Sequence, residues 1–295
     1  MNSFFRSFRS CAILVLAAAL LLLPLSARAD DGDELALDEI IEEEIIEDVD
    51  LDAVTYGGVT WDFPIALEDM EPDFVRIANK HYLLDKSYVP DPLVTVKTRK
   101  AAKDGSNSNG GLLKASGSKM QLQQTCLEAL VEMSEAAREE GYLLYLKSAY
   151  RSYQTQNTMY YNRLKRNNGK DDGWVAMPGS SDHQTGLGCD VVPRSWRDKS
   201  MNGKMGAEPE CIWMAEHCSE FGFILRYPED KEDITEINYE PWHMRYVGKP
   251  AAEYIMGNGL CLEEFIVELQ EAIQKFLDDG GDPALVEEFI QTPVD

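Results

Sequence analysis

The sequence of 295 residues predicts one α+β domain, and three observations support this class. Stretches with the helical period of 3.6 residues and shorter stretches with strand alternation both occur. They do not alternate in the regular strand–helix order of a doubly wound sheet. No internal repeat is visible. The regular stretches lie between residues 57 and 278, a length that suits one large domain.

Apolar spacing predicts the helices. The clearest case is residues 118–141, where Leu122, Cys126, Leu130 and Ala137 recur at intervals of three or four residues before Gly141. The same reasoning predicts further helices over residues 72–84, 152–168, 208–221 and 260–277.

Strands are predicted where apolar residues alternate or form short runs. The four candidates are residues 93–98, 142–150, 221–227 and 242–248. Between these elements, residues 104–111 and 168–180 are rich in Gly, Ser, Asn and Asp, a composition typical of loops.

Residues 1–29 have the organisation of a cleaved export signal. Arg6 and Arg9 precede an apolar run from Cys11 to Leu25, and Ala-Arg-Ala follows at 27–29. The run is about 15 residues, shorter than the roughly 20 that a membrane-spanning helix needs. We therefore expect an exported protein, periplasmic or associated with the cell wall, with no membrane span after cleavage.

The next segment is strongly acidic. Residues 30–52 contain thirteen acidic side chains and no basic one, so residues 30–56 are predicted to be a disordered leader, with a weak amphipathic helix as the alternative. A second acidic extension is expected at 279–295. The formal net charge of −24 argues against nucleic acid as a partner, because phosphate binding needs clustered Lys and Arg. A monomer is expected.

Cysteine usage predicts free thiols. Loss of residues 1–29 leaves Cys126, Cys189, Cys211, Cys218 and Cys261, an odd number with no dense disulfide framework. We expect buried thiols, and one disulfide stays possible.

Two short motifs carry candidate metal ligands. His183 precedes Asp190 by seven positions, and Glu240 precedes His243 by three. Two histidines and one carboxylate, with an open fourth position, form the ligand set of a catalytic Zn²⁺ site. A further carboxylate can serve as general base, and Glu240 is placed for that role. Gly186 would allow the sharp turn that brings His183 near Asp190.

Each motif alone is weak evidence, because both spacings are common by chance. Cys189 is an alternative ligand, although strand alternation directs it away from the side of Asp190. The other two histidines, His81 and His217, are expected to be structural.

Several segments together resemble a known family. They are NKHYLLDKSYVPDPLVTV, SAYRSYQTQ, SDHQTGLGCDVV, FGFILRYPEDKEDITEINYEPWHMRYVG and LCLEEF. Over about residues 75–270 the chain resembles the metallo D,D- and L,D-carboxypeptidases of bacterial cell-wall metabolism, of the VanY and LdcB type. The resemblance implies a small central antiparallel sheet with helices packed against it and zinc in a cleft at the sheet, the zinc carboxypeptidase domain being residues 57–278.

The resemblance also implies roles for individual residues. His183, Asp190 and His243 would bind Zn²⁺, and Glu240 would move a proton from the attacking water to the leaving amine. Arg151 would lie near the scissile carbonyl and the substrate carboxylate. Gln156 and Ser181 would help to hold the terminal carboxylate of the substrate.

The chain departs from the family at two positions that bear on the site. Gly188 stands where the family usually has Ala, and Glu236 stands where it usually has Gly. The second change puts the local turn before Glu240 in question.

The expected function is removal of the terminal D-Ala from peptidoglycan stem peptides by a zinc D-alanyl-D-alanine carboxypeptidase. An L,D-carboxypeptidase acting on tetrapeptide stems and a non-catalytic cell-wall-binding protein are alternatives. A dipeptidase acting on free D-Ala-D-Ala is a further one, but no motif for capturing the substrate ammonium is visible.

Overall fold

The computed structural model describes residues 54–96, 114–115 and 119–294. The predicted export signal and residues 30–53 of the predicted leader lie outside these ranges. The strands are β1 (Thr55–Tyr56), β2 (Val59–Thr60), β3 (Leu93–Thr95), β4 (Lys114–Ala115), β5 (Gln121–Gln123), β6 (Leu144–Ser148), β7 (Gly188–Pro193), β8 (Phe223–Leu225) and β9 (His243–Tyr246). The α-helices are α1 (Gln124–Glu139), α2 (Tyr153–Arg166), α3 (Pro209–His217), α4 (Glu232–Thr235), α5 (Lys249–Gly257) and α6 (Leu262–Asp278).

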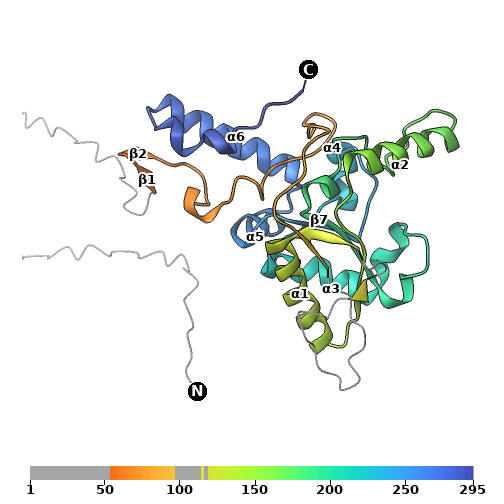
Figure 1. Ribbon diagram of the computed structural model, residues 1–295. Helices are drawn as coiled ribbons and strands as arrows, with labels where there is room; N and C mark the ends of the chain where they lie inside the picture. The colour runs from red at the N-terminus through yellow and green to blue at the C-terminus, as the bar shows by residue number, and fades with distance from the viewer. Residues whose placement is uncertain (1–53, 97–113, 116–118, 295) are drawn as a thin grey trace, which may run out of the picture. The chain divides into compact units, whose positions relative to one another are not determined.

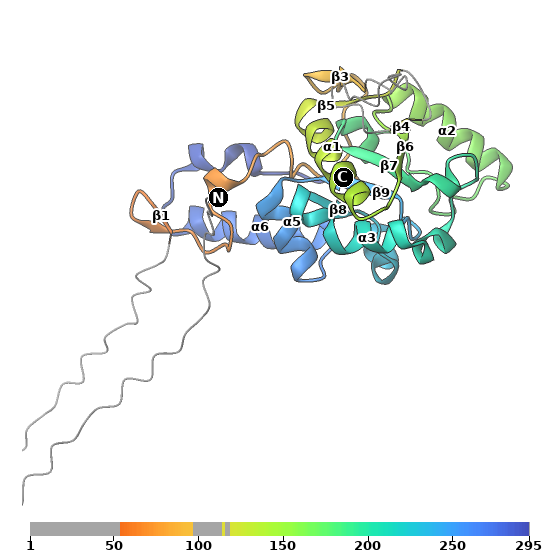
Figure 2. The ribbon, with the colours of Figure 1, turned by 90° about the horizontal axis from the view of Figure 1, so that it is seen from below.

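A five-stranded sheet with the order β4-β6-β7-β9-β8 forms the centre of the fold (Figures 1 and 2). Every neighbouring pair is antiparallel except β4 and β6, which are parallel. Two small antiparallel pairs, β1–β2 and β3–β5, complete the described strands. The predicted α+β class with a small antiparallel sheet is confirmed, and the parallel edge pair is an addition to it.

The two faces of β7 have different surroundings. Cys189 is fully buried, and its free thiol makes a hydrogen bond with the thiol of Cys126 of α1, so this face packs on the helix. Side chains alternate along a strand, and therefore Asp190 points to the opposite face. The fold thus separates an apolar face, which contributes to the core, from a polar face that is free to build a site.

A second apolar cluster joins the two ends of the described chain. Trp61 packs edge-to-face on Phe276 of α6, with ring centroids 5.7 Å apart. Val286 and Phe289, in the predicted C-terminal extension, are buried in the same cluster. Figure 1 shows the N-terminal segment with β1 and β2 beside α6. The segments that flank the sheet in sequence therefore share one core.

The helix predicted over residues 72–84 is wrong, because this segment forms turns. Its local backbone bonds are those of turns, such as the pair between Asn79 and Tyr82, and several of its backbone groups bond to distant side chains. Arg245 donates to the carbonyls of Phe74 and Arg76, and Gln291 accepts from Ile77 N at 2.8 Å. Tertiary contacts overrode the local helical pattern here.

The other predicted elements are present, with shifted ends. Within the helix predicted over residues 118–141, Gln121–Gln123 form β5, and α1 starts only at Gln124. The helix predicted over 208–221 ends at His217 and continues as a 3-10 turn. The short helix α5 was not predicted.

All five cysteines in the described residues are buried and unpaired, as expected. Among the described helices none is long and apolar enough to cross a membrane.

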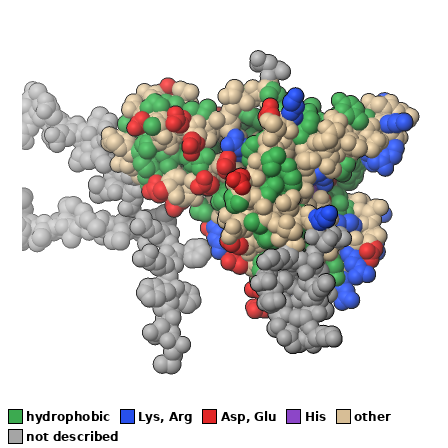
Figure 3. Space-filling view, in the orientation of Figure 1, with side chains coloured by type: hydrophobic (Ala, Val, Ile, Leu, Met, Phe, Trp, Pro, Cys, Tyr) green, Lys and Arg blue, Asp and Glu red, His purple; other side chains and the backbone are tan. Residues whose placement is uncertain are grey.

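The charges of the surface are unevenly distributed. Acidic side chains gather over the part that contains α6, and basic ones appear over the part that contains α2 (Figure 3). The last turn of α2 contains Arg163, Lys165 and Arg166. On the face that Figure 3 shows, the part over α2 is therefore more basic than the net charge of the sequence suggests.

Candidate active site

His183 lies in a short 3-10 turn, Asp182–Thr185, that precedes β7. Gly186 ends this turn with a φ of 72°, in the left-handed region that glycine adopts without strain. The ring nitrogen Nδ1 of His183 is 2.7 Å from the carbonyl oxygen of Ala149. If Nδ1 donates to this carbonyl, Nε2 carries the lone pair that a metal ion needs.

Asp190 and His243 are brought together by strand register. They are direct Cα partners of the antiparallel pair β7–β9, so their side chains leave the same face. Asp190 Oδ1 is 3.1 Å from His243 Nδ1 and 3.4 Å from His183 Nε2. Among the described residues these three form the one cluster whose ligand atoms all lie within 4.8 Å of one another.

This arrangement fits a zinc ion. Zinc bound to nitrogen and oxygen at about 2.0–2.1 Å in a tetrahedron has ligands about 3.3 Å apart. The distances of 3.1 and 3.4 Å match that spacing. All three side chains are buried, and their donor set has the composition of a catalytic zinc site.

Glu240 lies beside these ligands, in the loop three residues before β9. Its Oε2 is 3.6 Å from His243 Nδ1, and its backbone N–H donates to the carbonyl of Tyr227. Burial raises the pKa of Glu240 well above its usual range, the neighbouring Asp190 carboxylate adds to this, and Arg151 opposes it. A carboxyl group in this setting holds a proton more readily than one in water.

Arg151 faces the same cleft from the loop between β6 and α2. Its Nη1 donates to Gln156 Oε1 at 2.8 Å and its Nη2 to Ser148 Oγ at 3.1 Å. Burial lowers the pKa of Arg151, against the effects of Asp190 and Glu240, but an arginine stays charged in proteins. The guanidinium is thus a fixed cation beside the candidate metal ligands.

The structure places Gln156 behind Arg151. Its amide Nε2 donates to the carbonyl of Ala176 at 2.6 Å while its Oε1 accepts from the guanidinium. Both ends of this side chain are therefore engaged inside the protein. Ser181, also buried, precedes the turn with His183 and lines the cleft. Their predicted contacts with the substrate stay predictions.

The cleft has a volume of about 130 Å³ and an aromatic wall that the sequence reasoning missed. Trp174 stacks on Trp242 with an interplanar angle of 15°. The ring of Tyr227 is 5.0 Å from that of His243. Trp242 and Tyr227 lie inside the segment FGFILRYPEDKEDITEINYEPWHMRYVG that resembles the family, which was a usable signal. Trp174 lies in a loop and gave none.

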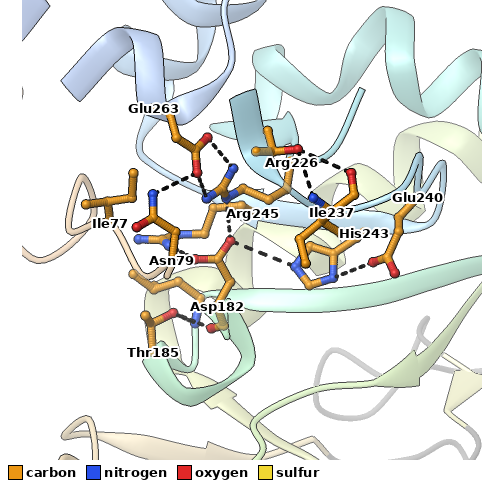
Figure 4. A network of polar contacts seen from close by, with 12 residues as sticks. Ile77, Asn79, Asp182, Thr185, Arg226, Ile237, Glu240, His243, Arg245 and Glu263 are labelled. Atoms are coloured by element: carbon orange, nitrogen blue, oxygen red, sulfur yellow. Dashed lines mark hydrogen bonds and ion pairs between the residues drawn. The ribbon is translucent and has the colours of Figure 1, made fainter. Parts of the chain in front are cut away.

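A buried ionic cluster behind the site was also missed (Figure 4). Asp182 bonds to both Arg226 and Arg245, and all three side chains are fully buried. Burial alone would raise the pKa of Asp182, but Arg245 and Arg226 outweigh it and hold this pKa below its usual value. Gly188 allows the close approach of this aspartate to β7, because a Cβ there would lie 2.8 Å from Asp182 Cβ.

The residues considered as alternatives lie elsewhere. Cys189 is on the α1 face of β7 and is outside the ligand cluster. His217 stacks on Trp213 and bonds to Glu220, and the exposed His81 faces Glu236. Glu236 has a φ of 56°, so it adopts the left-handed conformation for which the family glycine is suited.

Comparison with known proteins places this geometry in a family. Residues 119–249 match the VanY family, described as D-alanyl-D-alanine carboxypeptidase. The putative carboxypeptidase YodJ of Bacillus subtilis is 36% identical over 200 residues, which cover 68% of this chain and 69% of that protein. VanXYC of Enterococcus gallinarum, a bifunctional D-Ala-D-Ala dipeptidase and carboxypeptidase, is 36% identical over 44% of this chain and 70% of that protein.

Solved structures agree with these relatives. The LdcB LD-carboxypeptidase has a TM-score of 0.55 and 34% identity, covering 72% of this chain and 92% of that one. A zinc complex of a VanY D,D-pentapeptidase variant has a TM-score of 0.50 and 28% identity, covering 66% of this chain and 99% of that one.

Fold and relatives together define the protein as a metallocarboxypeptidase. The chain belongs to the VanY family of D-alanyl-D-alanine carboxypeptidases.

Proposed function

We propose that this protein is a zinc-dependent carboxypeptidase that removes the terminal D-Ala from peptidoglycan stem peptides. The observation that carries the proposal is the convergence of three ligand atoms, one further carboxylate and one guanidinium in a single cleft. The ligands are His183 Nε2, Asp190 Oδ1 and His243 Nδ1. When bound, the zinc ion supplies Lewis acidity that polarises the scissile carbonyl and activates a water.

Glu240 is proposed to move the proton. Its carboxylate takes a proton from the attacking water and gives it to the leaving amine of D-Ala. The raised pKa of Glu240 supports the first step, because a carboxylate with a raised pKa is a stronger base towards the water. The leaving amine is more basic still, so it can take the proton from the carboxyl group.

Arg151 is proposed to recognise the free C-terminus. A guanidinium offers parallel N–H donors to a carboxylate. The hydrogen bonds that Arg151 donates to Gln156 and Ser148 fix the plane of its guanidinium group. A peptide without a free terminal carboxylate leaves this buried cation unpaired, which favours exopeptidase action over internal cleavage.

The preference between D,D and L,D substrates depends on the stereochemistry of the residue before the scissile bond. We propose D,D action. The second candidate, L,D action on tetrapeptide stems, is favoured by the higher TM-score and identity to the LdcB LD-carboxypeptidase. A non-catalytic wall-binding role is the weakest candidate, because the ligand set and Glu240 are all present and adjacent.

Export by the N-terminal signal, and hence action in the periplasm or at the cell wall, is part of the same proposal. Peptidoglycan lies outside the cytoplasmic membrane, and the acidic leader is proposed to precede the catalytic domain as a solvated segment.

The test is mass-spectrometric detection of released D-alanine. The zinc-loaded protein is offered a pentapeptide stem ending in D-Ala-D-Ala and a tetrapeptide stem with an L-configured residue before D-Ala. We expect release from the pentapeptide, loss of release on chelation, and recovery with zinc. Glu240→Gln should lower kcat by about 10²- to 10⁴-fold.

Release from the tetrapeptide alone would favour the L,D candidate. A protein that binds zinc and wall peptides without releasing D-alanine from either would support the binding role and contradict the proposal.

A further inference from the structure

The second ring nitrogen of His243 has an unusual environment. Nδ1 faces Asp190 at 3.1 Å, on the side of the candidate metal site. Nε2 points the other way, is buried, and is among the few buried side-chain atoms in the described residues that have no hydrogen-bond partner. The acceptor opposite it is Asp182 Oδ2, at 4.0 Å (Figure 4).

The chemistry of the ring requires a proton on this nitrogen. A neutral imidazole that offers Nδ1 to a metal ion carries its hydrogen on Nε2. A buried N–H group without an acceptor is unfavourable, and 4.0 Å is beyond hydrogen-bond distance. A shift of about 1 Å in the ring or in the carboxylate makes this bond, and ligating histidines commonly donate their other N–H to a carboxylate.

Asp182 is itself held from two sides. Arg226 Nε donates to its Oδ2 at 2.6 Å, and Arg245 Nη1 donates to its Oδ1. Two arginines face one aspartate, and a second carboxylate completes the charge balance. Glu263 accepts hydrogen bonds from both terminal nitrogens of Arg226: its Oε2 from Nη1 at 2.7 Å and its Oε1 from Nη2 at 2.6 Å.

Glu263 connects this cluster to the C-terminal helix. It lies in the first turn of α6 and also accepts from Asn79 Nδ2 at 3.1 Å. A chain of contacts therefore runs from α6 through Arg226 and Asp182 to the ring of His243.

We propose that Asp182 is a positioning residue for His243, and that Glu263 acts on the same ring through Arg226. The carboxylate of Asp182 accepts a hydrogen bond from Nε2–H, which holds the proton on Nε2 and keeps Nδ1 free and aimed at the metal ion. The inference rests on the proposed zinc site. It adds that zinc affinity depends on the first turn of α6, outside the cleft.

The test is the zinc affinity of the full chain, measured by competition with a chromogenic chelator. Asp182→Asn keeps the size of the side chain and removes its charge; we expect a zinc Kd that rises about 10- to 100-fold. Glu263→Gln should raise the Kd in the same direction by a smaller factor. Circular dichroism of each metal-free variant establishes that it is folded.

The matched control is Glu264→Gln on the same turn of α6. Glu264 pairs with Lys231 and accepts from Cys261 N, away from the cluster. The zinc affinity of the Glu264→Gln variant should equal that of the unaltered chain. If Asp182→Asn changes the zinc Kd by twofold or less, the inference is overturned. If Asp182→Asn has its full effect on the Kd and Glu263→Gln has none, only the role given to α6 is overturned.

A second measurement needs no variant. In the zinc-loaded protein with ¹⁵N-labelled histidine, we expect His243 to be metallated at Nδ1 with a protected, downfield Nε2–H, and His183 to show the opposite tautomer. A His243 Nε2–H that exchanges freely with water contradicts the proposal even if Asp182→Asn does not fold.

The outcomes separate the two proposals. Failure of the unaltered chain to bind zinc overturns the proposed function together with the inference. Tight zinc binding by both the unaltered chain and Asp182→Asn overturns the inference alone.

Discussion

Asp190 and His243 face each other across two neighbouring antiparallel strands, with Oδ1 and Nδ1 3.1 Å apart. Because the register of β7 and β9 sets this distance, no loop has to move to bring the two candidate ligands together. A third, His183, comes from the turn that leads into β7. Sites on regular elements are held more precisely than sites on loops, and this one has two of three ligands on the central sheet.

The first prediction concerns the support of Arg151. Gln156→Ala removes a hydrogen bond to the guanidinium, a kind of bond that contributes about 1.5–3 kcal/mol. We expect kcat/KM for the pentapeptide to fall about 10- to 100-fold, with zinc affinity unchanged. Steady-state kinetics measure the first effect and chelator competition the second.

The control for this prediction is Gln154→Ala, an exposed position on the same helix, which should keep the activity of the unaltered chain. Equal activity of the two variants would contradict the role given to Gln156.

The second prediction concerns acid stability without metal. Burial first, and Arg151 next, lower the pKa of His183 below its usual value of about 6.5. The unfolded chain then binds a proton that the folded chain does not, so stability decreases as pH falls below about 6.5. The midpoint of thermal unfolding of the chelated protein should drop between about pH 7 and pH 5.

His183→Gln should reduce this slope, because it removes the titrating ring. An unaltered slope in that variant would assign the acid sensitivity to other groups.

The third prediction concerns the thiols. Burial raises the pKa of Cys211, Cys218 and Cys261 to about 12 in each case, and only the thiolate is nucleophilic. In a Cys11→Ser chain at about pH 8, the native protein should not react with a chromogenic disulfide reagent over minutes. The denatured protein should release the equivalent of five thiols.

Fast reaction of the native chain would show that at least one of these thiols is accessible, contrary to the packing described.

The fourth prediction concerns Glu236. Its left-handed conformation, with φ of 56°, costs a residue with a side chain about 1–2 kcal/mol. Glu236→Gly removes this cost, loses ion pairs that are partly exposed, and gains freedom in the unfolded chain. We expect a net stabilisation of about 0.5–1 kcal/mol in urea unfolding.

Asp233→Gly, in the right-handed turn just before, serves as the control and should destabilise the protein. Destabilisation by Glu236→Gly would mean that the pairs with Lys80 and His81 contribute more than exposed pairs usually do.

The local pattern of residues was sufficient for much of the molecule. Periodicity predicted α1, α2, α6 and the strand β9 that carries His243, because each of these elements has a face that is buried whatever its neighbours. The strand β7, which carries Asp190, was not among the predicted strands. The candidate ligands were also visible, since His183, Asp190, Glu240 and His243 stand in short motifs. The small antiparallel sheet was predicted only from the resemblance to a family, because periodicity does not tell which strands pair or in which direction.

Only the tertiary structure decided the contacts between distant segments. The turn at residues 72–84 looked helical, yet its carbonyls bond to Arg245. The cluster of Asp182, Arg226 and Glu263 joins three separate parts of the chain. An ion pair inside a protein depends on which charges are enclosed together, and enclosure follows from the complete packing. The sequence by itself therefore determined which residues could bind a metal ion, and the fold decided which residues hold them in place.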